Sequence, residues 1–333
     1  MKAAVIDNFG DNDRVHLADV PRPKPTGNDL LVAVKAASIN PVDFKIRAGK
    51  LKPLIPYRLP LILGNDLSGV VVEVGSEIKA FKVGDDIFAR LDKDRIGALA
   101  EFALVRESAA AKKPGRLSHI EAASLPLVGL TSWQVLIDIA RLSRGQRVLI
   151  HGGSGGVGTF AIQLAKHIGA EVFTTVGTRN IDLVRTLGAD HAIDYKTKRF
   201  EDVAKDMDVV YDTQGGETLL RSFQVVKRGG HVVTIGGSPD AKFARSWNLN
   251  PLLVVVLAIM ALGITSAAKR AGAHFDYWFV RADGAELARI GNLAEKGIIK
   301  PIIDRTFPLA EAKEALAYSE VGRATGKVVV EVG

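Results

Sequence analysis

The sequence predicts a two-domain α/β protein, and three observations lead to this fold class. The first 120 residues consist of short β-branched runs separated by turns rich in Gly, Pro and Asp. From about residue 118, apolar runs of strand length alternate with segments of helical periodicity. The chain has 333 residues, a length that two average domains account for.

The β-rich part, residues 1–120, is predicted to form a small barrel or sandwich. Its expected strands are MKAAVID, DLLVAVKAASI, GVVVEVG, DDIFARL and AEFALV. Turn signals such as PRPKPTGND and KVGD separate these runs. Short strands with this punctuation are typical of all-β units.

The middle part, residues 121–279, is predicted to form a parallel sheet with helices on both faces. A helical stretch begins after Ser118, which makes a capping-box pattern with Glu121. Predicted strands at 147–152, 170–176, 191–195, 208–213 and 230–237 then alternate with predicted helices at 157–168, 181–187 and 217–226. Strands that alternate with helices through short links pair in parallel.

The last part of the chain, from about residue 280 to 333, is predicted to complete the first domain. Residues 285–296 have helical periodicity, and the remaining residues predict a strand, a helix and a strand. We expect the final strand to return to the β-rich domain.

Residues 251–264, PLLVVVLAIMALGI, form a long apolar insert. A helix that spans a bilayer needs about 20 apolar residues, so no transmembrane span is expected. We expect a buried helix or strand. A weak peripheral membrane contact, or a subunit contact through an exposed strand, is the alternative.

Composition excludes several kinds of site. The chain has no cysteine, so disulfides, thiolate zinc sites and cysteine nucleophiles are excluded. The net charge is +7, but lysine and arginine are mixed with acidic residues along the chain, so no nucleic-acid partner is expected. The first residues lack the pattern of a signal or transit peptide, which favours a cytoplasmic location.

A glycine-rich turn lies between the first strand and first helix of the predicted parallel sheet. Gly153, Gly155 and Gly158 fit the pattern G-x-G-x-x-G. In this context the glycines allow a tight turn, close approach of a pyrophosphate and close packing of helix on strand. The turn therefore predicts a dinucleotide site at a helix N-terminus.

The end of the second strand indicates which dinucleotide is bound. An NAD site usually carries Asp or Glu there to bind the ribose 2′-hydroxyl. The sequence TTVGTRN has no acid, and Gly177, Thr178 and Arg179 suit a 2′-phosphate. NADPH is therefore the predicted cofactor. The alternative for Arg179 is a solvated residue in the first turn of a helix.

Together these segments resemble the medium-chain dehydrogenase/reductase superfamily, and within it the zinc-free quinone oxidoreductase branch. The resemblance covers nearly the whole chain and rests on AASINPVDFKIRAG, LPLILGNDLSGVVVEVGSEIKAFKVGDDIFA, LPLVGLTSWQVL, HGGSGGVGTFAIQLAKHIGA, LGADHAIDY and GRATGKVVV. It implies a GroES-like catalytic domain, residues 1–120 completed by about 280–333, and a Rossmann NADPH-binding domain, residues 121–279.

The chain departs from the zinc-dependent relatives, which place a cysteine ligand at Ser38 and a histidine–glutamate pair at Asn65 and Asp66. A serine, an amide and one carboxylate do not make a tetrahedral zinc site, so no metal is expected. The resemblance then implies hydride transfer to conjugated carbonyls (enones or enals) or to quinones. The alternatives are a zinc-independent ketone or alcohol dehydrogenase, and a non-catalytic NADPH- or RNA-binding crystallin-like protein.

The resemblance also implies catalytic residues. Lys45 stands where quinone oxidoreductases commonly carry tyrosine. It is expected to donate a proton or hydrogen bond, or to contact the cofactor; the alternative is a surface lysine. Asn40 is expected to shape the substrate site and Asp43 to hold it, with turn capping as the alternative.

Further cofactor contacts follow from the same resemblance. Thr131 is expected near the nicotinamide, and Tyr195 near the adenosine end. The other expected contacts are Ser154, Gly155, Gly156 and Val157 at the pyrophosphate, Gly236, Gly237 and Ser238 at the central part of the cofactor, the backbone of Phe279 and Val280 at the carboxamide, and the cations Arg323 and Lys327. A homodimer is expected by analogy.

Overall fold

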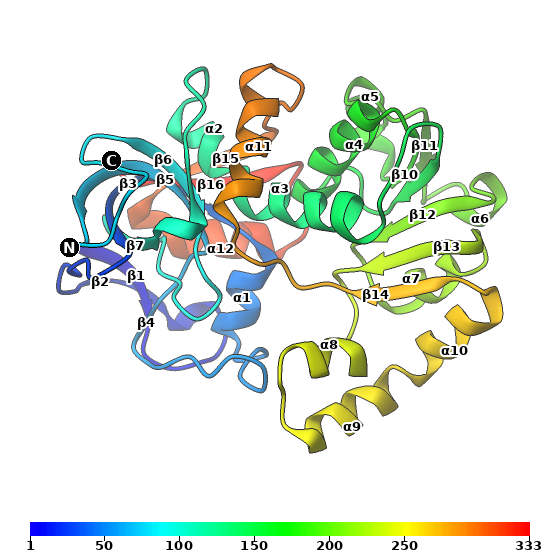
Figure 1. Ribbon diagram of the computed structural model, residues 1–333, viewed down its shortest axis with the longest axis horizontal. Helices are drawn as coiled ribbons and strands as arrows, with labels where there is room; N and C mark the ends of the chain where they lie inside the picture. The colour runs from blue at the N-terminus through cyan, green and yellow to red at the C-terminus, as the bar shows by residue number, and fades with distance from the viewer. The chain divides into compact units, whose positions relative to one another are not determined.

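The computed structural model describes residues 1–333 and divides the chain into two compact domains (Figure 1). The first consists of Met1–Leu130 with Arg281–Gly333, and the second of Thr131–Val280. This boundary lies ten residues after the sequence-based one at 120/121. The reason is that helix α2 (His119–Ala123) packs against strands β3 (Asp29–Ile39) and β5 (Asp66–Val74) of the first domain.

The first domain contains two sheets, in agreement with its β-rich sequence. The larger sheet has the order β15-β16-β3-β5-β6-β8, with β7 paired to β3. The smaller sheet has the order β2-β1-β4. The strands not yet given are β1 (Lys2–Ile6), β2 (Val15–Asp19), β4 (Leu61–Ile62), β6 (Asp86–Arg90), β7 (Phe102–Arg106), β8 (Ala110–Lys112), β15 (Ile303–Pro308) and β16 (Lys327–Glu331).

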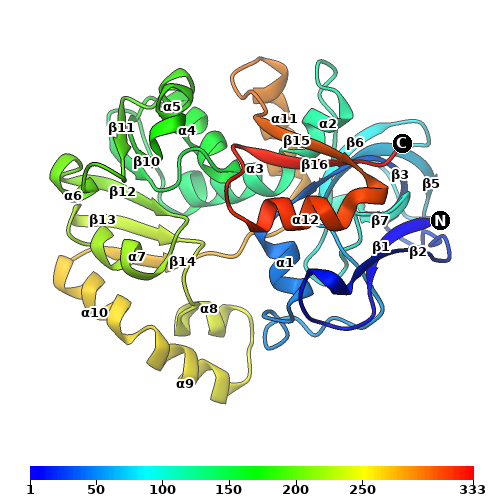
Figure 2. The same cartoon turned by 180° about the vertical axis from the view of Figure 1, so that it is seen from behind.

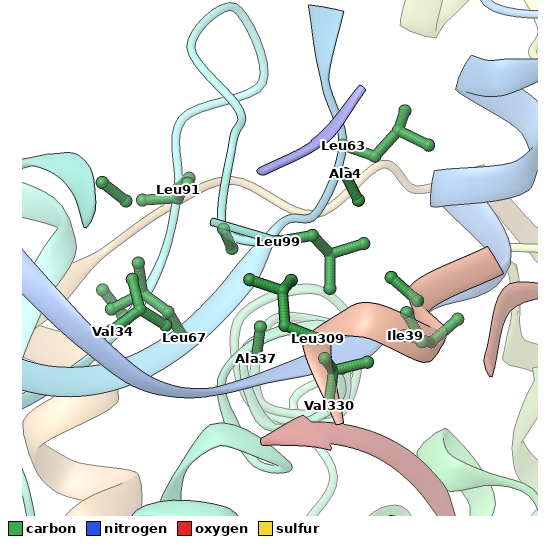
Figure 3. Packing of buried hydrophobic residues seen from close by; sticks show 14 of the residues in the cluster. Ala4, Val34, Ala37, Ile39, Leu63, Leu67, Leu91, Leu99, Leu309 and Val330 are labelled. Atoms are coloured by element: carbon green, nitrogen blue, oxygen red, sulfur yellow. The ribbon is translucent and has the colours of Figure 1, made fainter. Parts of the chain in front are cut away.

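Strand β3 organises the first domain because it pairs with β5, β7 and β16. Its apolar run is almost entirely buried. Figure 3 shows side chains from β3, β5 and β16, such as Val34, Leu67 and Val330, gathered with Leu99 in one apolar cluster. Strand β16 pairs antiparallel with residues 36–39 of β3, which confirms that the end of the chain returns to this domain.

Helices surround the sheets of the first domain. They are α1 (Pro41–Arg47), α3 (Pro126–Trp133, which crosses the boundary), α11 (Gly284–Glu295) and α12 (Ala312–Glu320), with short 3-10 turns at Asn12–Arg14, Glu107–Ala109 and Leu309–Glu311. Helix α1 begins at Asn40, where Pro41 supplies a residue suited to a first helical turn. The buried Arg47 ties α1 to α12 through two hydrogen bonds to the Glu320 carboxylate, of 2.8 and 3.0 Å.

The second domain is a six-stranded sheet in which every pairing is parallel, as the alternation of strands and helices predicted. The strand order is β11-β10-β9-β12-β13-β14. This is the 3-2-1-4-5-6 order of the Rossmann fold. The strands are β9 (Arg147–Ile150), β10 (Glu171–Val176), β11 (His191–Asp194), β12 (Met207–Asp212), β13 (Val226–Thr234) and β14 (His274–Tyr277).

The helices of the second domain connect these strands (Figure 2). They are α4 (Gly156–Ile168), α5 (Ile181–Thr186), α6 (Phe200–Val203), α7 (Gly216–Ser222), α8 (Ala241–Ser246), α9 (Pro251–Met260) and α10 (Leu262–Ala271), with a π-helix at Gln134–Ile139 and a 3-10 turn at Thr178–Asn180. Helix α7 ends four residues earlier than predicted, because Val226 already begins β13.

The apolar insert at 251–264 is helical, which is one of the two forms predicted for it, but the burial and the strand pairing expected of it are wrong. It forms α9 and the start of α10, and no strand, so strand pairing between subunits at this segment is wrong. Burial is also wrong: Leu257 is the one buried side chain of α9, whereas Leu252 is 72% exposed. No single helix is long and apolar enough to cross a membrane, although α9 and α10 together, bent by 58°, have the required length and composition.

Candidate active site

The glycine-rich turn joins β9 to α4 in the second domain. Its glycines differ in how closely other atoms surround them. A Cβ on Gly153 would lie 2.2 Å from Thr174 Oγ1, and a Cβ on Gly158 would lie 2.3 Å from the Gly152 carbonyl oxygen. No side chain fits at either position, because these backbones pack against β10 and against the turn itself. Gly153 and Gly158 are therefore required by the fold.

Gly155 lies in open space. A Cβ there would meet only the Gly152 carbonyl oxygen, at 3.5 Å. Residues 154–157 are half-buried, whereas Gly153 and Gly158 are buried. The N–H groups of the first turn of α4 have no partner within the helix, and the helix dipole adds positive potential at this end. Residues 154–157 therefore fit the pyrophosphate of a dinucleotide, and their own packing leaves room for it.

The residue that precedes the glycine-rich turn is a buried, neutral histidine, His151. His151 is completely buried, and burial lowers its pKa to about 3. Its Nε2 lies 3.1 Å from Ser222 Oγ and its Nδ1 lies 3.1 Å from Thr175 Oγ1. Because Ser222 Oγ donates to the Thr218 carbonyl, it accepts from His151, which assigns the proton to Nε2. His151 is part of the framework of this domain.

The turn after β10 holds the residues predicted at the 2′-position of the ribose. Thr178 and Arg179 are exposed, and the Tyr195 hydroxyl lies 3.4 Å from the position of a Cβ on Gly177. Asp194, at the end of β11, was not recognised in the sequence. It accepts a 2.6 Å hydrogen bond from Thr178 Oγ1, which helps to lower its pKa. A carboxylate therefore borders this turn, supplied by the third strand.

The ends of β12 and β13 are joined by a buried carboxylate that the sequence did not indicate. Asp212 accepts hydrogen bonds from Thr234 Oγ1 at 2.6 Å and from the Gly215 N–H at 2.9 Å. A Cβ on Gly236 would lie 2.7 Å from the Thr213 carbonyl oxygen. Gly236, Gly237 and Ser238 are thus held half-exposed at the carboxyl edge of the sheet, where ligands of this fold bind.

The remaining expected cofactor contacts of the second domain are its first residue, Thr131, and its last two, Phe279 and Val280. Thr131 is buried in α3. Phe279 and Val280 follow β14, and the Phe279 ring packs edge-on against Trp247, with ring centroids 5.1 Å apart. Val280 is buried and Phe279 is half-buried. Their backbone is therefore fixed by packing of their side chains.

In the first domain, a cluster of buried polar side chains surrounds Asn40. Lys327 Nζ donates to Asn40 Oδ1 at 2.5 Å and to the Ile39 carbonyl at 2.9 Å, and lies 3.9 Å from Asp66 Oδ2. Asp66 Oδ2 accepts from Asn40 Nδ2 at 2.9 Å and from Ser38 Oγ at 3.0 Å. The Lys327 side chain is 6% exposed. The structure thus brings Asn40 and Lys327 together, but inside the domain, and leaves Arg323 exposed at its surface.

Asp43 belongs to the same cluster and is completely buried. Its Oδ2 accepts from the Asn40 N–H and its Oδ1 accepts from Asn65 Nδ2, both at 2.7 Å. Burial raises the pKa of Asp43 to about 7, although these two hydrogen bonds favour the carboxylate. Asp43 therefore fixes the start of α1.

Lys45 lies two residues after Asp43, on the exposed side of α1. Partial desolvation lowers its pKa, and the charge of Lys50 lowers it further. A lysine with a lowered pKa gives up a proton more readily at neutral pH. Arg90 is a buried residue that the sequence did not single out, and its Nε and Nη2 atoms have no hydrogen-bond partner.

Comparison with known proteins places this geometry in a family. Residues 26–115 match the alcohol dehydrogenase GroES-like domain, and residues 187–330 match the zinc-binding dehydrogenase family. The whole chain is 36% identical to the NAD(P)H oxidoreductase RTN4IP1, mitochondrial, of Mus musculus, and covers 89% of that protein. The chain belongs to the medium-chain dehydrogenase/reductase superfamily.

Two more members of the superfamily are informative. The chain is 37% identical to the 2-methylene-furan-3-one reductase of Solanum lycopersicum, over 99% of this chain and 79% of the relative. The structure superposes on the quinone oxidoreductase of Escherichia coli complexed with NADPH, with a TM-score of 0.85, 26% identity and full coverage of both chains. Within the superfamily, the chain whose structure is described here is an NAD(P)H-dependent oxidoreductase of the quinone and enone reductase branch.

The zinc ion implied by the name of one matched family does not fit the residues present. The three positions are occupied by Ser38, Asn65 and Asp66, and each makes a hydrogen bond to another side chain of the buried cluster. No group of three or more His, Cys, Asp or Glu side chains in the chain has the arrangement of a metal site. The buried cluster holds Lys327 Nζ beside Asp66 instead.

We expect substitutions at two glycines to separate folding from dinucleotide binding. Gly158→Ala should lower the free energy of unfolding by about 1–3 kcal/mol, because its Cβ collides with backbone. Gly155→Ala should change stability by less than about 1 kcal/mol but weaken NADPH binding about tenfold or more, since its Cβ stands where the pyrophosphate approaches. Urea unfolding and fluorescence titration measure the two effects. Unchanged NADPH affinity in Gly155→Ala would contradict the assignment of the turn.

Asp43 predicts a pH dependence of stability. Its pKa is raised from 3.8 to about 7, so between these values the folded protein binds more protons than the unfolded chain. The free energy of unfolding should therefore fall as the pH rises through this window, by up to about 1.4 kcal/mol per pH unit, and Asp43→Asn should remove this contribution. Urea unfolding at pH values across the window measures the difference between the two proteins.

Asp94→Asn is the matched control, because Asp94 is exposed and its pKa is lowered. The stability of this variant should run parallel to that of the wild type across the same window. Parallel curves for Asp43→Asn as well would show that Asp43 titrates like an ordinary carboxyl.

Proposed function

We propose that this protein is an NADPH-dependent, zinc-independent reductase of α,β-unsaturated carbonyl compounds or quinones. The observation that carries the proposal is the buried cluster in which Lys327, Asn40 and Asp66 are bonded to one another where zinc-dependent relatives bind metal. With no Lewis acid to polarise an alcohol or a saturated ketone, a conjugated acceptor is the suitable substrate, because its β-carbon is already electron-poor. The activities named for the tomato and Escherichia coli relatives support the same class.

The second domain would hold the cofactor. Bound NADPH supplies the hydride. Residues 154–157 and the first turn of α4 would bind the pyrophosphate, and the segment Gly236–Ser238 would line the central part of the cofactor. Thr131, Phe279 and Val280 stay proposals for the nicotinamide end, as does Tyr195 for the adenosine end.

The first domain would supply the group that handles the proton. We assign this role to Lys45, because it is exposed on α1 and its pKa is lowered. Asn40 and Asp43 would position α1 from inside the domain. Lys327 was expected to contact the cofactor; its burial against Asn40 favours a positioning role instead. Arg323 keeps its proposed role as a cation toward the cofactor.

Preference for NADPH over NADH rests on the turn after β10. No acid lies in that turn, and Arg179 is exposed there. Two more exposed cations, Lys196 and Lys198, follow β11, whereas the next one, Arg199, pairs with Glu201. Asp194 acts in the opposite sense, because an ionised carboxylate repels a 2′-phosphate. The cations outnumber it, which favours NADPH.

A homodimer and a cytoplasmic location stay predictions. Strand β14 is an edge strand of the Rossmann sheet, so it offers unpaired backbone groups to a second copy. The expected cytoplasmic location differs from that of the mouse relative, whose name places it in mitochondria.

Product analysis tests the proposed reaction. We expect NADPH oxidation with enones, enals or quinones, and a saturated ketone as the product from an enone. An alcohol formed from the same enone would indicate the alternative carbonyl reduction. Tight RNA binding without NADPH binding, measured side by side on filters, would instead favour the non-catalytic alternative.

Arg179→Ala tests the choice of cofactor. Loss of a charged hydrogen bond to the 2′-phosphate should raise the KM for NADPH about tenfold or more and leave the KM for NADH nearly unchanged. Asp194→Asn is the companion variant, and it should improve NADPH binding by removing a negative charge. Equal effects of Arg179→Ala on both cofactors would remove the argument from the 2′-phosphate.

Lys45→Ala tests proton donation. If Lys45 donates a proton in the rate-limiting step, kcat should fall about 100-fold or more with little change in the KM for NADPH. Lys50→Gln should move the alkaline limb of the kcat profile to higher pH, because removing that charge raises the pKa of Lys45. A change confined to the KM for NADPH would leave Lys45 only a binding role.

A further inference from the structure

Helix α9 and the first residues of α10, residues 251–264, form an exposed surface that we call the apolar arm. Six large aliphatic side chains on it are between 42% and 72% exposed: Leu252, Val255, Val256, Ile259, Met260 and Leu262. On α9 four of these lie at the spacing i, i+3, i+4 and i+7, so they share one face of the helix. The face that a soluble protein normally makes polar is here aliphatic.

The helical segments on either side of the apolar arm are packed into the second domain, and α8 also contacts α9. Phe243 of α8 is buried and packs against Trp247 and Tyr277. At the other end, Ala267 and Ala268 of α10 are buried in the apolar cluster of the Rossmann sheet. Figures 1 and 2 show α9 between α8 and α10, at the margin of the domain on the side of β14. The exposed face is therefore presented by a packed support.

The segment that contains the arm has basic residues but no acidic ones. Residues 241–275 contain Lys242, Arg245, Lys269 and Arg270, and no aspartate or glutamate. Lys242 pairs with Asp276, just beyond the segment. Arg245, Lys269 and Arg270 are exposed on both sides of the arm. Cations that flank an exposed aliphatic face match the headgroups and acyl chains of an anionic lipid layer.

The length of the helices and the charge around them indicate which kind of surface covers the arm. Helices α9 and α10 have ten residues each, about 15 Å, which is half the hydrocarbon thickness of a bilayer. A bend of 58° separates them. The arm therefore fits one leaflet. Residues 241–275 contain no acid that could pair with Arg245, Lys269 or Arg270 of a second copy, which disfavours a second arm as the covering surface.

We propose that the apolar arm inserts into the outer part of one leaflet of an anionic bilayer. Leu252, Val255 and Ile259 enter the acyl chains, and Arg245, Lys269 and Arg270 contact the phosphates. The proposal concerns attachment to a membrane surface and stands independently of the proposed reaction.

Vesicle sedimentation tests the proposal with the full chain. Wild type is mixed with vesicles of phosphatidylglycerol and phosphatidylcholine, or of phosphatidylcholine alone. We expect partition to the anionic vesicles, and a decrease of at least tenfold for Val255→Asn/Ile259→Asn and for Lys269→Glu/Arg270→Glu. Val83→Asn is the matched control, because Val83 is 60% exposed in the first domain, and its partition should equal that of wild type.

Folding and oligomeric state are measured on the same proteins. Circular dichroism and urea unfolding without vesicles establish that each variant is folded, and the fall of wild-type partition with rising salt gives a second measure that needs no variant. Wild type that stays in the supernatant with every vesicle would overturn the proposal. So would arm variants that partition like wild type, or a wild-type dimer that Val255→Asn/Ile259→Asn dissociates while no vesicle is bound.

Discussion

The hydrogen bond from Lys327 to Asn40 is the contact on which the first domain depends. It joins β16, near the end of the chain, to the residue that begins α1. Asn40 in turn donates to Asp66 through its side chain and to Asp43 through its backbone. The direction in which α1 leaves the sheet, and hence the position of Lys45, follows from this one cluster.

The cluster is stable because each of its polar side chains forms a hydrogen bond or an ion pair with another member. Two carboxyls and an amine are buried together, and burial alone would disfavour every charge among them. Burial raises the pKa of Asp66 and lowers that of Lys327, and each of the two groups opposes the change in the other. Ser38 and the Leu127 N–H complete the hydrogen bonds of Asp66. A protein cation thus balances the carboxylate that stands at a position equivalent to a metal-site residue of the relatives.

Local periodicity predicted most of the fold. β3 has the same limits in the sequence-based prediction and in the structure, residues 29–39, because its apolar run is bounded by Asn28 and by Asn40 before a proline. The parallel sheet and the glycine-rich turn followed from the alternation of strands and helices. The exposure of α9 could not be predicted, because an aliphatic helix has the same pattern whether it is buried or faces outward.

The site was predicted less completely, because its pairs come from distant parts of the chain. Lys327 was expected at a cofactor, and no local pattern links it to Asn40. Asp194 escaped notice because the usual acid stands on the second strand, whereas the register that sets Val176 beside Asp194 exists only in the folded sheet. Arg179 and the glycines could be proposed from the sequence because the argument for them is local.

The return of β16 to β3 also sets the order in which the chain can fold during synthesis. The second domain, Thr131–Val280, is continuous, so it can fold as soon as it leaves the ribosome. The first domain has to wait, because the partners Asn40 and Lys327 are 287 positions apart. Until β16 is synthesised, Asp43 and Asp66 lie in an incomplete domain. Residues 36–39 of β3 then lack the strand that pairs with them in the complete sheet. The buried cluster can therefore form only after the chain has been translated through β16.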